Sequence, residues 1–569
     1  MLVLGVGGLL HDASAALLSD GRILCAIESE KVTRHHREVS TLPVEAIDAV
    51  LREAGVTMGD VDCIVTNWKA GPWANGWYVP LILRHCLRGT SPWRSVGAQI
   101  AIAGSHTTAS MEMSARMGKL PPVHRVKHHL AHVGCSYTLS PFEDAAVAII
   151  DGTGEIDATS LYVCSGRKTR RIWSAGLPFD SLGTVYAMGT EHLGFRMLGD
   201  EYKVMALAAR GERHARFDRF FADLVRMTPS GRYRIDGRLL GDVTRSGHRF
   251  PVSIQSRIGK PRISNEPLSQ EHADFAKAMQ DRIGDVIVEL LRGLRKETGS
   301  SNLSLGGGVA LNSVINGRIA RETGFANVYV PPAPHDGGTA MGAAAYFTSQ
   351  VLGLARPEPV VHAYLGPNFA HAEVAGALAR SGMPHAEVAD PAATAASLVQ
   401  QGNVIGWFQG RAEFGPRALG NRSIIADPRI ADHRERVGRV IKGREGFRPI
   451  APAVLEEHHA AYFPDTPPSP FMSFVGRVAA ERRVDIVAAV HVDGTARPQS
   501  ISRRDNPLFH RLVSCFAEAT GVPAVINTSF NVSGEPIVMK PEDAIRTFYA
   551  SSLDALVIGN FMMRKSAGS

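Results

Sequence analysis

The chain has 569 residues, of which 44% are hydrophobic and 21% charged, and its formal net charge is +7. A chain of this length is expected to form about two to four domains rather than a single core. The modest positive charge suits anionic small molecules as well as nucleic acid, so it does not choose between them. The six cysteines show no CxxC spacing, which argues against a zinc ribbon, a disulfide framework or a thioredoxin-like site.

The first residues, MLVLGVGG, lack a basic segment and a cleavage signal, so no secretory signal is expected. The sequence also has no run of about 18 apolar residues that would span a bilayer. We therefore expect a cytoplasmic protein that does not associate with a membrane.

The N-terminal pattern predicts a strand, a polar loop and a β-hairpin within residues 2–27. His11 stands in the polar loop. A histidine there can cap the turn, or it can act as a general base, because its unperturbed pKa lies near neutrality. Residues 43–54 have proline in the first turn and Gly55 just after the end, which predicts a helix.

Four of the six tryptophans lie within residues 68–93, among prolines and glycines that do not favour a regular core element. Trp68, Trp73 and Trp77 belong to this group. They form either a buried satellite cluster or a loop-built pocket for an apolar or ring-shaped ligand.

The segment 127–155 contains the most specific indication of a functional site, a candidate metal site. His128 and His132 are four residues apart in a predicted helix, which stacks both imidazoles on one face. A predicted strand over 145–150 then ends in Asp151 and a glycine-rich turn. Two imidazoles and a carboxylate suit Fe(II), Mn(II) or Zn(II), and the glycines allow a phosphate to approach the backbone. A surface helix with two solvated histidines is the alternative.

Residues 2–27 and 145–164 open in a similar way, which suggests an internal duplication of the kind found in the actin and sugar-kinase superfamily. Apolar residues at helical spacing predict a long helix over 270–297. A strand at 303–305 then runs into three glycines, a weak sign of a nucleotide site. Asp336 begins a helix of small residues, where it can cap the helix or supply a fourth metal ligand.

The composition changes beyond a linker predicted at 353–362. Residues 411–448 hold ten Arg or Lys against five Asp or Glu, mostly on loops with glycine and proline. Such arginines suit phosphate and carboxylate oxygens, which they bind through paired hydrogen bonds. Aromatic residues are not interleaved with the basic ones, so a nucleic-acid groove is not favoured.

Nine motifs in the same order resemble the antibiotic and nodulation O-carbamoyltransferases, the tobramycin carbamoyltransferase type. They are HDASAALLSDGRI, HHLAH, DGTGE, EYKVMALA, GGVALN, EFGPRALGNRSI, FRPIAP, HVDGTARPQS and NTSFNVSGEPIV. The resemblance covers nearly the whole chain. It implies an α/β protein with a duplicated actin-like (ASKHA) domain at 1–352, the linker at 353–362 and a YrdC-like α/β domain at 363–569.

The resemblance also implies an ATP-dependent enzyme that makes carbamoyl adenylate from carbamoyl phosphate in the C-terminal domain. The actin-like domain then transfers the carbamoyl group to a hydroxyl of a secondary metabolite. The implied metal is Fe(II), with Mn or Zn as alternatives, and Mg(II) is expected with ATP.

Site roles follow residue by residue from the matching motifs. The general base is His11, and the metal ligands are His128, His132, Asp151 and Asp336. The implied ATP or adenylate contacts are Glu28, Gly152, Gly308 and Asn312. The implied contacts to carbamoyl phosphate and ATP are Arg417, Lys442, Arg448, Met472, Arg497, Asn527 and Ser529.

The chain departs from the family pattern at two places. His35, His36 and Arg37 stand where the family type carries a lysine that reaches the nucleotide. The loop before His11 is shorter and apolar (Leu9-Leu10), without the acidic residue that would meet an aminoglycoside. We therefore expect a bulky apolar glycoside or polyketide as acceptor, bound by Trp68, Trp73 and Trp77. No nucleic acid or membrane partner is expected, and a homodimer is left open.

Three other functions agree less well with the sequence. A tRNA threonylcarbamoylation-type enzyme is the main alternative, but it needs a charged RNA-facing surface and usually separate chains. The hydrogenase-maturation carbamoyltransferases carry CxxC pairs that this sequence lacks. A degenerate actin-like scaffold is disfavoured by the retained His11, the four metal-ligand candidates and the arginine set.

Overall fold

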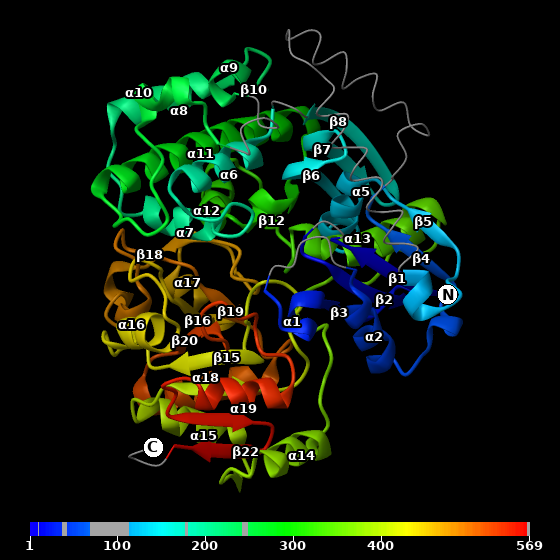
Figure 1. The fold of residues 1–569 in the computed structure, drawn as a ribbon, viewed down its shortest axis with the longest axis vertical. Coiled ribbons are helices and arrows are strands. Elements are labelled where there is room, and N and C mark those ends of the chain that lie inside the picture. The colour runs from blue at the N-terminus through cyan, green and yellow to red at the C-terminus, as the bar shows by residue number, and fades with distance from the viewer. Residues whose placement is uncertain (9–10, 37–41, 69–112, 177–179, 242–248, 566–569) are drawn as a thin grey trace. The chain divides into compact units, whose positions relative to one another are not determined.

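The computed structural model describes residues 1–8, 11–36, 42–68, 113–176, 180–241 and 249–565 (Figure 1). The chain divides into two compact units. The first contains Met1–Ile23, Arg37–Ile47 and Val56–Pro359, and the second contains Leu24–His36, Asp48–Gly55 and Val360–Ser569. The sequence assigned 1–352 to one domain, whereas the structure groups two N-terminal segments with the C-terminal part.

Two five-stranded sheets form the frame of the first unit. The order in one is β3-β2-β1-β4-β5, and in the other β12-β11-β6-β7-β8. The strands of the former are β1 (Leu2–Gly7), β2 (Ser14–Ser19), β3 (Arg22–Glu28, which from Leu24 onward is grouped with the second unit), β4 (Cys63–Thr66) and β5 (Val123–Arg125). Those of the latter are β6 (Asp144–Gly154), β7 (Asp157–Ser165), β8 (Lys168–Gly176), β11 (Asn302–Gly306) and β12 (Asn327–Tyr329).

The two sheets share one topology. In each, the first strand pairs antiparallel with the second, β1 with β2 and β6 with β7. On its other side the first strand pairs parallel with a later strand, β1 with β4 and β6 with β11, and a further parallel strand follows. The repeated order confirms the internal duplication predicted from residues 2–27 and 145–164.

Helices alternate with these strands along the chain of the first unit. They are α2 (Val44–Glu53, continuing into the second unit), α5 (His128–Val133), α6 (Leu182–His192), α7 (Glu201–Ala208), α8 (Ala215–Leu224), α9 (Gly237–Leu240), α10 (Gln255–Ile258), α11 (Gln270–Thr298), α12 (Ser313–Glu322) and α13 (Thr339–Tyr346). A small hairpin of β9 (Val225–Met227) and β10 (Tyr233–Ile235) accompanies α8.

The long helix predicted over 270–297 is confirmed as α11, which is labelled in Figure 1. It begins after Ser269, whose backbone N–H donates to Nδ1 of His272 (2.9 Å), and it ends at Gly299 with a left-handed φ of 66°. The predicted apolar face is buried, as Phe275, Met279 and the residues at helical spacing after them show. Burial of that face stabilises the helix by roughly 25 cal/mol per Å² of apolar surface.

The second unit is built on one eight-stranded mixed sheet, in the order β13-β22-β21-β14-β15-β20-β16-β19. Its strands are β13 (Ala386–Glu387), β14 (Ile405–Phe408), β15 (Arg422–Ala426), β16 (Ala451–Leu455), β19 (Gln499–Ile501), β20 (Ala524–Ser529), β21 (Ala555–Ile558) and β22 (Phe561–Arg564). A short pair, β17 (Gly476–Arg477) and β18 (Thr495–Ala496), stands apart from it. The helices are α1 (Ser29–Thr33), α14 (His371–Ser381), α15 (Pro391–Gln400), α16 (His433–Glu435), α17 (His459–Tyr462), α18 (Pro507–Thr520) and α19 (Pro541–Tyr549).

Both faces of this sheet are covered by helices. Side chains alternate along β14, so Ile405 and Trp407 enter one apolar core while Phe408 enters the other. The first core also contains residues of α15 and α18, and the second contains residues of α14 and α19. The second unit is therefore a three-layer α/β/α arrangement. Among the described residues, none of the helices of either unit has the length and apolar character needed to cross a bilayer.

Candidate functional site

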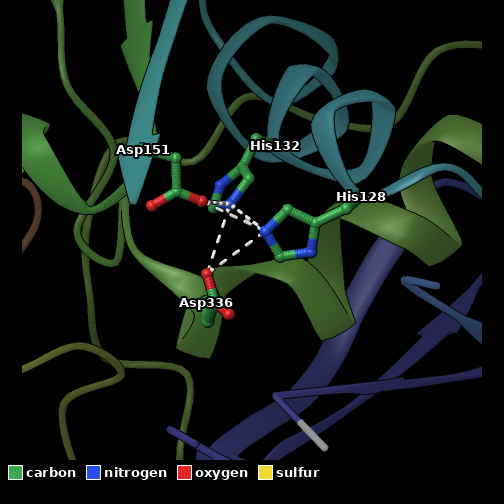
Figure 2. Close-up of side chains that lie close together, drawn as sticks. All are labelled: His128, His132, Asp151 and Asp336. Atoms are coloured by element: carbon green, nitrogen blue, oxygen red, sulfur yellow. Dashed lines mark hydrogen bonds and ion pairs between the residues drawn. The ribbon is translucent and has the colours of Figure 1, made fainter. Parts of the chain in front are cut away.

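Four side chains of the first unit converge on one point (Figure 2). His128 and His132 come from α5, Asp151 from the end of β6, and Asp336 from the short 3₁₀ turn before α13. The Nε2 atoms of the two histidines are 3.1 Å apart, and they lie 3.1 and 3.2 Å from Oδ2 of Asp151. Both Nε2 atoms lie 3.4 Å from Oδ1 of Asp336.

This geometry fits a single metal ion. The ligand atoms of all four residues lie within 4.8 Å of one another, and all four residues are buried. A tetrahedral ion with ligand distances of about 2.0–2.2 Å separates its ligand atoms by about 3.3–3.6 Å. The observed separations, 3.1–3.4 Å, lie at or slightly below the lower end of that range. Two imidazoles and two carboxylates match the donor preferences of first-row divalent metals.

The predicted helix explains how the two histidines meet. Because α5 is helical, His128 and His132 lie one turn apart on the same face. The third histidine of the HHLAH motif, His129, points elsewhere, and its Nδ1 lies 2.8 Å from the hydroxyl of Ser160. Burial and the neighbouring His128 lower the pKa of His129 to about 3, so it remains neutral.

Glycines bring the small-residue helix α13 close to α5. A Cβ on Gly134 would lie 1.9 Å from the carbonyl oxygen of Gly342, and one on Gly342 would lie 2.1 Å from that of Ala131. No side chain fits at either position, so the two helix backbones are in direct contact. This contact fixes the separation between the histidines and Asp336, which immediately precedes α13.

Backbone donors orient Asp151. Its Oδ1 accepts hydrogen bonds from the N–H groups of Gly152 (2.9 Å) and Gly308 (3.0 Å), which leaves Oδ2 for the histidines. Such outer contacts orient a metal-ligating carboxylate. Gly152 and Gly308, two of the implied adenylate contacts, therefore both lie beside a metal-ligand candidate. The carboxylate of Asp336 does not cap α13, which favours the ligand interpretation over the capping one.

The charges of the cluster are strongly coupled. Burial opposes a charge on His128, but Asp336 and Asp151 outweigh it and raise its pKa well above the usual value. The pKa of His132 is raised in the same way. Despite burial, His128 and His132 hold the pKa of Asp151 below its usual range, and His128 and His11 do the same for Asp336. Both carboxylates are therefore ionised, as metal ligation requires.

His11 lies beside this cluster. Its Nδ1 lies 3.0 Å from Oδ2 of Asp12, and its Nε2 lies 3.8 Å from Oδ2 of Asp336. Burial opposes protonation, but Asp336 and Asp12 outweigh it and raise the pKa of His11 to about 9. Asp12 adopts a left-handed φ of 55°, a conformation uncommon outside glycine and typical of functional turns. The ring of His11 is partly exposed.

Trp68 packs against the metal-ligand candidates. Its ring meets that of His128 edge-on at 5.3 Å, and only 4% of its surface is exposed. The amide nitrogen of Asn67 lies 3.4 Å from Nδ1 of the same histidine. Since Trp68 has little surface to offer an acceptor, we interpret it as packing that holds the ring of His128. Trp73, Trp77 and Leu9-Leu10 lie outside the described residues.

Asn312 is held by a network that the sequence did not predict. Its side chain caps α12 by accepting from the N–H of Ile315 (3.1 Å), and it exchanges two hydrogen bonds with Gln280 (2.9 and 3.1 Å). The hydroxyl of Tyr186 donates to the same Gln280 at 2.7 Å. Gln280 lies on α11 and Tyr186 on α6, both far from GGVALN in sequence, so only the fold brings them together.

The second unit contains a group of cations with strong mutual repulsion. The group, called the cation cluster below, consists of Arg417, Lys442, Arg444, Arg448 and Arg497. Burial and Arg448 lower the pKa of Arg417 to about 10. Burial, followed by three neighbouring arginines of the cluster, also lowers the pKa of Arg497. Buried positive groups that repel one another in this way suit a negatively charged ligand, which would offset their charge.

Lys442 and Arg444 both contact the last residues of β20, and Lys442 also contacts the loop that follows. Lys442 is 1% exposed and donates to the hydroxyl of Ser529 (2.7 Å) and to Oδ1 of Asn531 (2.6 Å). Burial, Arg444 and Arg448 lower its pKa well below the usual value. A guanidinium nitrogen of Arg444 lies 3.3 Å from the Ser529 hydroxyl. Lys442 and Ser529 belong to the predicted contacts, and Asn531 lies two residues after Ser529 in the motif NTSFNVSGEPIV. Arg444 lies outside the nine motifs and was not predicted as a contact.

The remaining residues predicted for this pocket are placed as follows. Asn527 is fully buried and donates to the side chain of Gln499 at 2.6 Å. Met472 is buried with a left-handed φ of 55°, which is strained for a residue with a side chain. Its role in the pocket stays a prediction. Glu28, predicted as an adenylate contact, is buried in the second unit, where it accepts the N–H of Gly415 at 2.5 Å.

Comparison with known proteins identifies the family. The family model described as Carbamoyltransferase N-terminus matches residues 2–345, and the one described as Carbamoyltransferase C-terminus matches residues 396–565. The chain belongs to the carbamoyltransferase family. It is therefore a carbamoyltransferase enzyme, as the nine ordered motifs predicted.

Curated relatives match nearly the whole chain, and one of them is named as an O-carbamoyltransferase. Nodulation protein NolNO of Sinorhizobium fredii is 35% identical over 98% of this chain and 80% of its own length. The 3'-hydroxymethylcephem-O-carbamoyltransferase of Streptomyces clavuligerus is 28% identical over 98% of each chain. An uncharacterized protein of Synechocystis, sll1178, is 35% identical over 99% of this chain and 97% of its own length.

Proposed function

We propose that this carbamoyltransferase uses ATP to move a carbamoyl group from carbamoyl phosphate to a hydroxyl of a small-molecule secondary metabolite. The cation cluster of the second unit is the observation that carries the proposal. Its residues suit the phosphate groups of carbamoyl phosphate and ATP, because arginine binds such oxygens through paired, charge-assisted hydrogen bonds.

The proposed reaction has two stages. In the second unit, water releases phosphate from carbamoyl phosphate, and the resulting carbamate oxygen attacks the α-phosphate of ATP. Carbamoyl adenylate forms and pyrophosphate leaves. In the first unit, the acceptor hydroxyl attacks the carbamoyl carbon, the bond to the phosphate oxygen breaks, and AMP leaves. The products are the O-carbamoylated acceptor and AMP.

The residues around the metal-ligand candidates suit the second stage. His11 is the proposed base that takes the proton of the acceptor hydroxyl at its Nε2, while Asp12 holds its Nδ1 (3.0 Å). When bound, a divalent cation supplies positive charge that offsets Asp336 beside His11 and that stabilises negative charge on the departing phosphate. His128, His132, Asp151 and Asp336 would hold that cation, for which we propose Fe(II), with Mn(II) or Zn(II) as alternatives.

The implied folds also remain proposals with structural support. The repeated five-stranded topology of the first unit agrees with a duplicated actin-like domain. The eight-stranded mixed sheet of the second unit, covered on both faces, agrees with a YrdC-like domain. The natural acceptor class stays the sequence-based prediction, an apolar glycoside or polyketide.

The test is an assay of the full-length protein with ATP, carbamoyl phosphate, Mg(II) and Fe(II). We expect pyrophosphate release that requires both substrates and proceeds without an acceptor. With a panel of hydroxylated glycosides and polyketides, mass spectrometry should detect an acceptor that gains a carbamoyl group. Binding of ATP without any release of pyrophosphate would contradict the proposal and would favour a scaffold.

A further inference from the structure

The N-terminal segment Leu24–His36 forms part of the second unit, although it precedes Val360 by more than three hundred residues. The N–H of Ala26 donates to the carbonyl of Leu365 at 2.9 Å. At the other end of the segment, Arg34 donates to the carbonyl of Pro536 at 2.9 Å and lies 3.5 Å from Asp543. The segment is therefore attached at both ends to loops and helices of the C-terminal part.

Lys31 lies in the middle of this segment and is 2% exposed. Its ammonium group donates to the carbonyl oxygens of Glu413 and Gly415, both at 2.7 Å, and lies 2.9 Å from Oε2 of Glu28. An ammonium group has three hydrogens to donate, and three acceptors surround it. Lys31 therefore has no donor left for a phosphate.

Glu28 completes a closed set of contacts with the same loop. One of its oxygens accepts the N–H of Gly415 at 2.5 Å, and the other faces Lys31. The pair thus binds both the donor and the acceptor groups of the backbone at 413–415. Both carboxylate oxygens of Glu28 are engaged within the protein, and the side chain is only 5% exposed.

The loop between β14 and β15 is also held by hydrogen bonds among its own residues. Oε1 of Glu413 accepts the backbone N–H groups of Leu419 (2.7 Å), Asn421 (2.9 Å) and Arg422 (3.1 Å). Arg417 of the cation cluster stands between these two sets of bonds, two residues after Gly415. Any shift of the backbone at 413–415 would therefore move Arg417.

We propose that Glu28 and Lys31 are positioning residues of the cation cluster, holding the loop of Arg417 in place without touching the nucleotide. This inference rests on the proposed binding of carbamoyl phosphate by that cluster. It assigns Glu28 a role different from the adenylate contact that the resemblance implied. It also explains why a short N-terminal segment belongs to the C-terminal unit.

The test compares Lys31→Met with the wild-type full-length protein. We expect inorganic phosphate to bind at least about tenfold more weakly in calorimetric titrations, because misplacing a binding group by ~1 Å can cost about a hundredfold. The KM for carbamoyl phosphate in pyrophosphate release should rise by a similar factor. The metal content should stay unchanged, since the metal-ligand candidates lie in the other unit.

Two further variants separate positioning from stability. Glu28→Gln/Lys31→Met removes both buried charges, so thermal stability should recover relative to Lys31→Met while phosphate binding stays weak. Arg429→Met is the matched control. It also leaves a buried carboxylate without its cation, because Arg429 pairs with Asp427 (2.7 Å; Asp427 1% exposed) beyond the other end of β15. Phosphate binding should be retained in this control.

The outcomes distinguish this inference from the proposed function. Equal phosphate affinities for Lys31→Met and Arg429→Met would overturn the positioning role and leave the pair a stabilising contact. A wild-type protein that binds phosphate but releases no pyrophosphate would contradict the proposed reaction. In that case the ratio of the phosphate affinities would still decide whether Glu28 and Lys31 position the cluster.

Discussion

His11 shares a neighbour with the metal-ligand candidates, and its chemistry follows from that position. Asp336 lies 3.8 Å from its Nε2 and contributes to raising its pKa to about 9. We predict that His11→Ala lowers carbamoyl transfer by about 10²–10⁴-fold, the usual contribution of a positioned general base. Metal content and pyrophosphate release should stay near wild type. Full transfer activity in the variant would leave His11 a turn residue.

The ion pairs among the four metal-ligand candidates should make the stability of the fold depend on pH. The pKa values of His128 and His132 are raised above the unfolded value near 6.5, so their ion pairs stabilise the fold below that pH. This stability is lost as the pH rises through the raised folded pKa values. The lowered pKa values of Asp151 and Asp336 act only at far lower pH.

A bound cation must displace the protons of these histidines, so its affinity should increase with pH. We predict that the difference in Tm between metal-loaded and chelator-treated protein grows from pH 6 to pH 9. Calorimetry in buffers of different ionisation enthalpy should detect the release of about one to two protons per ion near neutrality. A Tm difference that is constant across this pH range would contradict the assignment of the histidines as ligands.

At the scale of elements, the position of Asp336 depends on the contact between α5 and α13. We predict that Gly134→Ala is destabilising, because its Cβ would lie 1.9 Å from the carbonyl oxygen of Gly342. Overpacking of this kind costs about 1–3 kcal/mol, which exceeds the gain of up to ~1 kcal/mol in helix propensity. The separation of the helices should also increase, so metal affinity should fall together with Tm.

Gly438→Ala provides the control for this prediction. Gly438 lies in a helical turn of the second unit, and no atom beyond its own turn lies within 4 Å of the position that its Cβ would take. The variant should therefore be neutral or slightly stabilised. If Gly134→Ala melts and binds metal like Gly438→Ala, the close contact of α5 and α13 does not set the geometry of the cluster.

Patterns over a few neighbouring residues of the sequence predicted single helices and strands and the side chains that they place together. The four-residue separation of His128 and His132 and the apolar strand before Asp151 are examples. The long-range partners were not predictable in this way. Lys31 meets the carbonyl of Glu413 across 382 residues, and Gln280 meets Asn312 across 32. Such contacts depend on how elements pack, which neither helical nor strand periodicity encodes.

At the scale of the whole molecule, the two units predict two separable half-reactions. The cation cluster belongs to the second unit and the metal-ligand candidates to the first. Arg448→Ala removes one cation that faces Lys442 and Arg497. A charge-assisted hydrogen bond is worth about 1.5–3 kcal/mol, so pyrophosphate release should fall by at least about tenfold.

His132→Ala should have the opposite pattern. It removes one of four metal-ligand candidates, so metal content and carbamoyl transfer should fall sharply, while pyrophosphate release without acceptor should remain near wild type. Carbamoyl adenylate should then accumulate, which mass spectrometry of quenched reactions can detect.

The matched control is His129, the neighbouring histidine whose ring contacts Ser160 and not the cluster, so His129→Gln should retain its metal. If His132→Ala abolishes pyrophosphate release as completely as Arg448→Ala does, adenylate formation depends on both units and the assignment of one half-reaction to each is wrong.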